Sequence, residues 1–320
     1  MSDLGSPSVS ILTPAYNAEG TIAAAIASVQ AQERSDWELV IVDDGSTDGT
    51  ANAAREAAAG DARIKIVSQR NAGCGFARNT AAANASADMF CLLDADDEYL
   101  PQYLTRMLAL TERHPDRDLY SCNGYFVFPN GARVPVRKGP TWDREREFTA
   151  EEMIRESLVF LPAMFRRSAF ERVGGFRRRV LEDLDFWARL LLSGGRHIYT
   201  PEILSLYNLK PDSISASLDT MQRERLDVIE TLAEEYPEIR GSYYDASHAL
   251  QVRRVAFAEL ERRIVDGDLR GARRGFFAAW PVHRTLARKY VGGATMLVHP
   301  ALYKRVFLGR LYPPIGQGKA

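Results

Sequence analysis

The chain has 320 residues, 46% of them hydrophobic and 26% charged, and its formal net charge is −1. These values are typical of a soluble globular protein with one large domain or two smaller ones. No run of 18 apolar residues occurs and residues 1–8 are short and polar, so we expect neither a membrane-spanning helix nor a secretory signal.

The charge is unevenly distributed. From Arg262 onward, 12 Lys and Arg stand against two Asp, so this segment carries +10 and residues 1–261 carry −11. A basic tail indicates an anionic partner, although a solvated helical face gives the same pattern. The three cysteines match no zinc or disulfide spacing, and we expect a reducing, cytoplasmic compartment.

The first hundred residues alternate short apolar runs with helical patterns. Strands are predicted at 9–12, 39–42, 64–67 and 89–93, and helices at 21–32, 50–59 and 76–85. This alternation favours an α/β fold in which a mostly parallel central sheet is flanked by helices on both faces.

The pattern changes after residue 97. Helices are predicted at 101–113 and 181–192, strands at 119–128 and 163–165, edge strands at 196–200 and 204–209, and an irregular loop at 132–149. From residue 217 the chain reads as almost wholly helical. We therefore predict a catalytic domain at 1–216 and a helical C-terminal region at 217–320.

Three carboxylates, Asp94, Asp96 and Asp97, follow the fourth predicted strand. Ligands of open α/β sheets bind at the carboxyl ends of the strands, and carboxylates with substrate phosphates are the usual ligands of Mg²⁺ or Mn²⁺. The sequence alone equally allows a solvated turn that caps the next helix.

Two further strand ends carry polar groups that would share this edge of the sheet. One is the run from Thr13 to Asn17, which contains Tyr16, and the other is Asp43-Asp44. An aromatic face, hydrogen-bond acceptors and a metal-type site together suit a nucleoside diphosphate, and Asp44 can accept a hydrogen bond from a base. The alternative is that Asp43 and Asp44 only stabilise a turn with Gly45.

Arg78 lies at the start of the third helix, after a glycine-rich loop. This position suits a contact with a phosphate, and an ordinary surface arginine is the alternative.

Several motifs resemble, in order and spacing, those of inverting family 2 glycosyltransferases of the GT-A fold. They are VSILTPAYN at 9–17, ELVIVDDGSTD at 38–48, NAGCGFARN at 71–79, LDADD at 93–97, and RVGGF at 172–176 followed by EDLDFWARL at 182–190. The likeness covers about residues 8–215. It implies a nucleotide-diphospho-sugar transferase fold with a nucleotide-binding half at about 8–100 and an acceptor half at about 101–216.

The resemblance also implies roles for matched positions. Asp94 and Asp96 would bind Mn²⁺ or Mg²⁺, with Asp96 as the more direct ligand. The donor nucleotide would be held by Thr13, Pro14, Ala15, Tyr16, Asp44, Arg78, Asp94 and Ala95.

Asp183 would be the general base that removes a proton from the acceptor hydroxyl. From the residues alone, Glu182 and Asp183 are equally typical of a helix N-terminus. Glu182 and Trp187 would support the acceptor side, where Trp187 either packs against a sugar ring or belongs to the core. Lys210 stands where many relatives have a histidine near the metal, and a lysine ammonium suits the leaving diphosphate as a point charge.

The predicted function is metal-dependent, inverting transfer of a sugar from a nucleotide-sugar, foremost a UDP-sugar, to a saccharide or lipid-linked acceptor in cell-surface polysaccharide synthesis. The alternatives are a metal-dependent sugar nucleotidyltransferase and a non-catalytic nucleotide-sugar binding module. The five histidines show no metal-ligand spacing, which argues against a zinc hydrolase.

Basic and aromatic residues alternate in the C-terminal region, for example at Arg273, Arg274, Phe276 and Phe277. This mixture suits a helix in an anionic membrane interface, at the inner face of the plasma membrane, and no nucleic acid partner is expected. The alternative is a helical subdomain that packs on the catalytic domain or on a second subunit.

Overall fold

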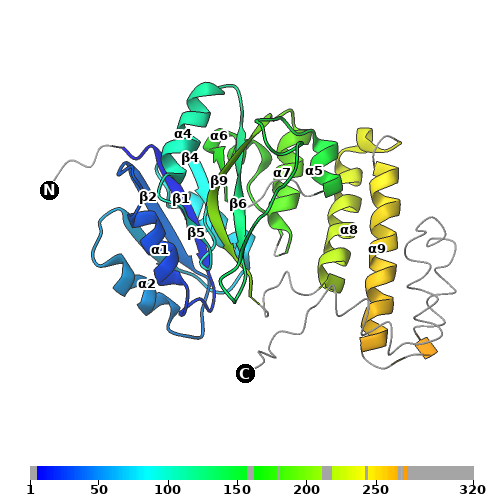
Figure 1. Ribbon diagram of the computed structural model, residues 1–320, viewed down its shortest axis with the longest axis horizontal. Helices are drawn as coiled ribbons and strands as arrows, with labels where there is room; N and C mark the ends of the chain where they lie inside the picture. The colour runs from blue at the N-terminus through cyan, green and yellow to red at the C-terminus, as the bar shows by residue number, and fades with distance from the viewer. Residues whose placement is uncertain are drawn as a thin grey trace. The chain divides into compact units, whose positions relative to one another are not determined.

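The computed structural model describes residues 6–156, 162–178, 180–210, 218–241, 244–265, 268 and 270–271. Contacts divide the chain into one unit of residues 1–216 with 231–238 and a second of 217–230 with 239–320. Within the described ranges, the first unit holds a nine-stranded sheet in the order β3-β2-β1-β4-β8-β6-β9-β5, with β7 paired to β6 (Figure 1). The strands are β1 (Val9–Ala15), β2 (Trp37–Asp43), β3 (Ile64–Ser68), β4 (Met89–Leu92), β5 (Glu98–Tyr99), β6 (Leu119–Val127), β7 (Arg133–Pro135), β8 (Ala163–Arg166) and β9 (His197–Asn208).

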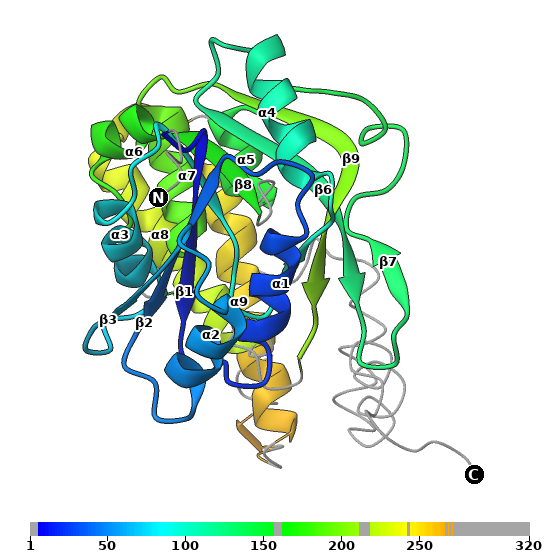
Figure 2. The ribbon, with the colours of Figure 1, turned by 90° about the vertical axis from the view of Figure 1, so that its left-hand side faces the viewer.

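The sheet has two parts with different pairing. Strands β3, β2, β1 and β4 are parallel, and β1 and β2 pair over their whole length (Figure 2). Strand β8 runs antiparallel to both β4 and β6, and β9 then runs parallel to β6. The first part confirms the predicted parallel sheet, and β8 joins it to the second part.

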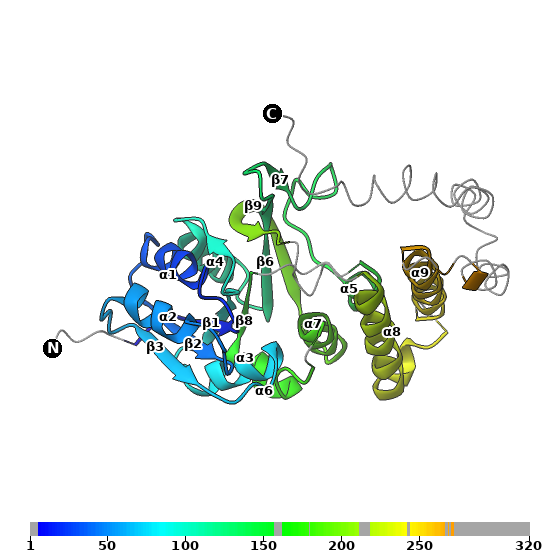
Figure 3. The same ribbon diagram turned by 90° about the horizontal axis from the view of Figure 1, so that it is seen from below.

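Helices cover both faces of the sheet. In the first unit, α1, α2 and α4 lie on one face, and α3, α6 and α7 lie on the other (Figure 3). The helices are α1 (Ile22–Gln30), α2 (Thr50–Ala58), α3 (Cys74–Ala83), α4 (Tyr103–Arg113), α5 (Ala150–Glu156), α6 (Arg167–Val173), α7 (Glu182–Leu192), α8 (Leu218–Glu235) and α9 (Tyr244–Val265).

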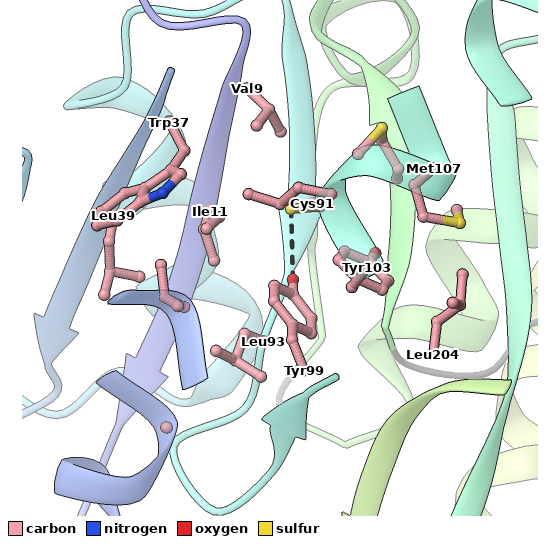
Figure 4. Packing of buried hydrophobic residues seen from close by; sticks show 14 of the residues in the cluster. Val9, Ile11, Trp37, Leu39, Cys91, Leu93, Tyr99, Tyr103, Met107 and Leu204 are labelled. Atoms are coloured by element: carbon pink, nitrogen blue, oxygen red, sulfur yellow. Dashed lines mark hydrogen bonds between the residues drawn. The ribbon is translucent and has the colours of Figure 1, made fainter. Parts of the chain in front are cut away.

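The core on the first face follows the alternation of the strands. Ile11 of β1 and Leu39 of β2 point to the same side and pack with α1 and α4 (Figure 4). There, the Tyr99 hydroxyl contacts the Cys91 sulfur at 3.3 Å, and the Tyr99 and Tyr103 rings stack with their centroids 3.9 Å apart. This packing makes a rigid support for the loops at the carboxyl ends of the strands.

Three details differ from the sequence predictions. The two predicted edge strands at 196–200 and 204–209 form the single strand β9, which lies between β6 and β5 rather than at the edge. Pairing with β6 reaches Tyr199 and resumes at Ile203, so residues 200–202 form a register shift within one continuous strand. The predicted loop at 132–149 contains β7, and strand β5 and helices α5 and α6 were not predicted.

In the second unit, polar contacts join α9 to the first part of α8. Gln251, which is buried, donates to the backbone oxygen of Gln222 at 2.8 Å, and Arg223 pairs with Glu259 at 2.7 Å. None of the described helices is both long and apolar enough to cross a membrane. Most of the basic C-terminal segment, with Arg273, Arg274, Phe276 and Phe277, lies outside the described residues.

Candidate functional site

A cleft of about 410 Å³ lies at the carboxyl ends of β1, β2 and β4. The predicted site residues that line it are Pro14, Ala15, Tyr16, Asp44, Asp94, Ala95, Asp96 and Lys210. Sequence reasoning missed Val180, which lies just before α7, and Cys74, which lies inside a recognised motif. Burial raises the pKa of the Cys74 thiol well above its usual value.

Tyr16 lies directly after β1 and is 51% exposed, unusually much for a large aromatic side chain. The backbone on either side of it is fixed. The Asp44 N–H donates to the Ala15 oxygen at 2.8 Å, and Asn17, with a left-handed φ of 49°, accepts the Thr47 N–H at 2.9 Å. An exposed ring on a fixed backbone is suited to stacking against a planar group.

The Asp44 carboxylate is buried and holds the loop that leads into α3. It accepts the backbone N–H groups of Ala72 and Gly73 at 2.9 and 2.8 Å. Asp43 instead accepts the Ser46 N–H at 3.1 Å. Asp43 therefore has the turn-stabilising role that was the alternative for Asp43 and Asp44. Asp44 therefore brings the ends of β2 and β3 to the cleft.

The acidic run 94–97 does not cap a helix, because the next helix begins only at Tyr103. The loop is held by Asn208 at the end of β9, which donates its N–H to Asp97 Oδ1 at 2.9 Å and its side-chain amide to the Asp96 oxygen at 2.8 Å. Burial, and then the neighbouring Asp94 and Asp96 carboxylates, raise the pKa of Asp97 well above its ordinary value. Asp97 is thus an anchor, while Asp94 and Asp96 line the cleft.

Lys210 forms an ion pair with Asp96, with Nζ 3.1 Å from Oδ2. Both side chains are more than a third exposed. Exposed pairs of this kind add little to stability and exchange partners readily. The ammonium of Lys210 is therefore available to other anions in the cleft.

Glu182 and Asp183 occupy the first turn of α7, as expected for acids at a helix N-terminus. The turn is tight, because Leu181 before it has a left-handed φ of 52°. Burial, and then the Glu182 charge, raise the pKa of Asp183 to about 6, while Arg78 opposes this shift. Asp183 therefore titrates nearer to neutrality than an ordinary aspartate.

Arg78 does not face the cleft, contrary to the prediction of a phosphate contact. Its side chain is 1% exposed, which also excludes the alternative of a surface arginine. It donates through Nη2 to Asp94 Oδ1 at 2.6 Å and through Nη1 to Glu182. Arg78 thus joins Asp94, which was predicted on the donor side, to Glu182, which was predicted on the acceptor side.

Two other predicted residues are buried. Trp187 is 0% exposed and packs edge-to-face against Phe165, with ring centroids 5.3 Å apart. The prediction that it supports a sugar is therefore wrong, because the aromatic core occupies its faces, and the core alternative is confirmed. Thr13 is 1% exposed and lies inside β1, one residue short of the cleft lining.

Residues 10–174, just over half of the chain, match the sequence profile of glycosyl transferase family 2. The chain belongs to this family. Similar proteins include the succinoglycan biosynthesis protein ExoO of Rhizobium meliloti, 28% identical over 92% of this chain and 89% of that protein. The UDP-Glc:alpha-D-GlcNAc-diphosphoundecaprenol beta-1,3-glucosyltransferase WfgD of Escherichia coli is 41% identical over 39% of this chain and 49% of its own length.

Among solved structures, the mannosyltransferase PcManGT of Pyrobaculum calidifontis, in complex with GDP-Man and Mn²⁺, superposes with a TM-score of 0.63. It is 20% identical, and the match covers 97% of this chain and 89% of that one. The fold is the GT-A type of family 2 glycosyltransferases, and the protein is a glycosyltransferase.

Proposed function

We propose that this glycosyltransferase moves a sugar from a UDP-sugar to a saccharide or lipid-linked acceptor, with inversion, in cell-surface polysaccharide synthesis. The observation that carries the proposal is the cleft itself, where an exposed aromatic ring and three carboxylates from two strand ends line one cavity. The role of ExoO in succinoglycan biosynthesis supports the polysaccharide context, and the UDP-Glc donor of WfgD supports a UDP-linked donor.

In this proposal the base and the diphosphate occupy opposite ends of the cleft. At one end Tyr16 stacks on the base, and Pro14, Ala15 and Asp44 line the space around it. At the other end Asp94 and Asp96 face the diphosphate. Lys210 leaves Asp96 for the departing phosphate, to which its ammonium binds as a point charge.

Two carboxylates fit a divalent ion of the Mn²⁺ or Mg²⁺ type, because such ions prefer hard oxygen ligands. In the described part of the chain no three His, Cys, Asp or Glu side chains gather as a metal site, so Asp94 and Asp96 would need phosphate and water oxygens beside them. When bound, such an ion neutralises charge on the leaving diphosphate. The Mn²⁺ in the PcManGT complex supports this proposal.

Asp183 acts as the general base on the acceptor side. As the acceptor oxygen bonds to the anomeric carbon, the bond from that carbon to the diphosphate breaks and Asp183 takes the hydroxyl proton. Attack from the face opposite the diphosphate inverts the anomeric centre. A pKa of about 6 suits this role, because the carboxylate is ionised at neutral pH yet basic enough to accept a proton.

We also propose that residues 1–216 form the catalytic domain and that the basic segment after Arg262 contacts an anionic membrane where a lipid-linked acceptor lies. The full-length protein should sediment with vesicles rich in anionic lipid at low salt and not with neutral vesicles. Equal recovery with both would contradict the membrane contact, and a concentration-dependent dimer would favour the subunit alternative.

The test of the function is a donor panel of UDP-glucose, UDP-galactose, UDP-GlcNAc and GDP-mannose, each with and without Mn²⁺. We expect one donor to release its nucleoside diphosphate, faster with Mn²⁺. Release of pyrophosphate from a sugar phosphate and UTP would instead identify a nucleotidyltransferase. Binding without turnover, under any acceptor tested, would identify a binding module.

A further inference from the structure

The motif at 71–79 lines the cleft through Asn71, Gly73 and Cys74, and its later residues contact the acceptor side of the first unit. Asn79 accepts the Phe176 N–H at 2.9 Å and donates to the Phe176 oxygen at 2.7 Å. Gly75 lies so close to α7 that an added Cβ would stand 3.0 Å from Glu182 Cβ and would meet the Arg178 oxygen. The first turns of α3 and α7 are therefore in direct contact.

Arg78 completes this contact with charge. Its buried guanidinium binds Asp94, which follows β4, and Glu182, which begins α7 and lies 104 residues further along the chain than Arg78. A guanidinium is planar and always charged, so two carboxylates on its terminal nitrogens are held in a fixed geometry. A direct role in donor binding is disfavoured, because Arg78 is 1% exposed and is not part of the cleft lining.

We propose that Arg78 is a positioning residue that fixes the acceptor-side pair Glu182–Asp183 relative to the donor-side Asp94. The inference rests on the proposed function and deepens it, since it assigns the 71–79 motif to the alignment of the two substrates. Aligned reactants account for a large part of enzymatic rate enhancement, and a displacement of about 1 Å can cost about 100-fold. Loss of Arg78 should therefore impair transfer far more than nucleotide binding.

The test compares Arg78→Lys and Arg78→Gln with Arg167→Lys in the full-length protein. Arg167 is a matched control, because it also makes two hydrogen bonds, at 2.9 and 2.8 Å to the Ala87 and Ala85 oxygens, and stacks on Phe90 without touching an acid of the site. The measurements are the UDP dissociation constant by calorimetry, kcat for transfer, the pH profile of kcat/KM and the thermal unfolding midpoint.

For Arg78→Lys we expect kcat to fall about 100-fold, with UDP affinity changed by no more than about threefold. In Arg78→Gln the acid limb of the pH profile should also move to higher pH, because the counter-charge near Asp183 is lost. Arg167→Lys should keep wild-type kcat. If Arg78→Gln does not fold, Arg78→Lys retains the charge and decides alone.

Three outcomes would overturn the proposal. A wild-type kcat in Arg78→Lys would contradict a positioning role while leaving the proposed function intact. A loss of UDP affinity equal to the loss of kcat would show that Arg78 acts through donor binding instead. If the wild-type protein transfers no sugar from any donor, the proposed function fails and this inference fails with it.

Discussion

The two halves of the first unit build their parts of the site in different ways. In the donor half, Tyr16, Asp44 and Asp94 each follow a strand of one parallel sheet, so sheet topology alone brings them together. In the acceptor half, Asp183 depends on a strained turn and on side chains that come from α3. The donor site is thus a consequence of the parallel sheet, whereas the acceptor site depends on a single turn and on a charged side chain from another helix.

The largest expected effect tests the acceptor half. Asp183→Asn removes the proposed base, so transfer should slow by about 10²–10⁴ while UDP affinity stays near wild type. Steady-state kinetics and calorimetry measure the two effects. A variant that keeps more than a tenth of the wild-type rate would rule out Asp183 as the base.

The second prediction for the acceptor half concerns folding stability and is made at Asp185, two residues after Asp183 in α7. Its carboxylate is fully buried and accepts Arg177 Nη2 at 2.8 Å and Arg189 Nε at 2.9 Å. Because Arg189 would lose this counter-charge and Arg177 would keep its ion pair with Glu235 alone, Asp185→Asn should lower the free energy of unfolding by about 3 kcal/mol. Urea denaturation measures the change.

The matched variant in the donor half is Glu38→Gln. The Glu38 carboxylate is also buried, but hydroxyl groups of Ser10 and Ser86 share its hydrogen bonds with Lys65. We expect a smaller loss of about 1–2 kcal/mol. A larger loss at Glu38 than at Asp185 would contradict the greater dependence of the acceptor half on charged contacts.

The third prediction concerns the pH dependence of kcat/KM. The base must be ionised, and burial together with Glu182 raises the pKa of Asp183 to about 6, so kcat/KM should fall about tenfold per pH unit below 6 and be flat above it. An ordinary aspartate would keep its activity down to about pH 4. A profile of kcat/KM from pH 4 to 8 distinguishes the two.

The smallest expected effect returns to the donor half. Tyr16→Ala should weaken UDP binding about tenfold, because stacking on a base contributes about 1–3 kcal/mol. Phe76→Ala is the control, since Phe76 is also exposed but does not line the cleft. Equal UDP affinities in the two variants would argue against stacking on Tyr16.

The sequence predicted the donor half well, because alternating strands and helices define a parallel sheet and polar residues at strand ends then share one edge. It predicted β9 as two edge strands, because residues 200–202 interrupt the pairing with β6. The pairing resumes at Ile203, a contact that periodicity does not reveal. Arg78 and Trp187 were misplaced for a similar reason. Whether a side chain in the first two turns of a helix meets solvent or another element depends on segments that are distant in the sequence.

The three cysteines have a practical consequence. Cys91 and Cys122 are fully enclosed in the core, Cys74 lines the cleft, and burial raises the pKa of all three thiols, to about 12 for Cys91. Only a thiolate reacts readily with alkylating agents or oxidants. Iodoacetamide at pH 7 should therefore leave activity unchanged, as mass spectrometry and an assay of the treated enzyme would check. A protein with these cysteines should tolerate storage in air without added reductant.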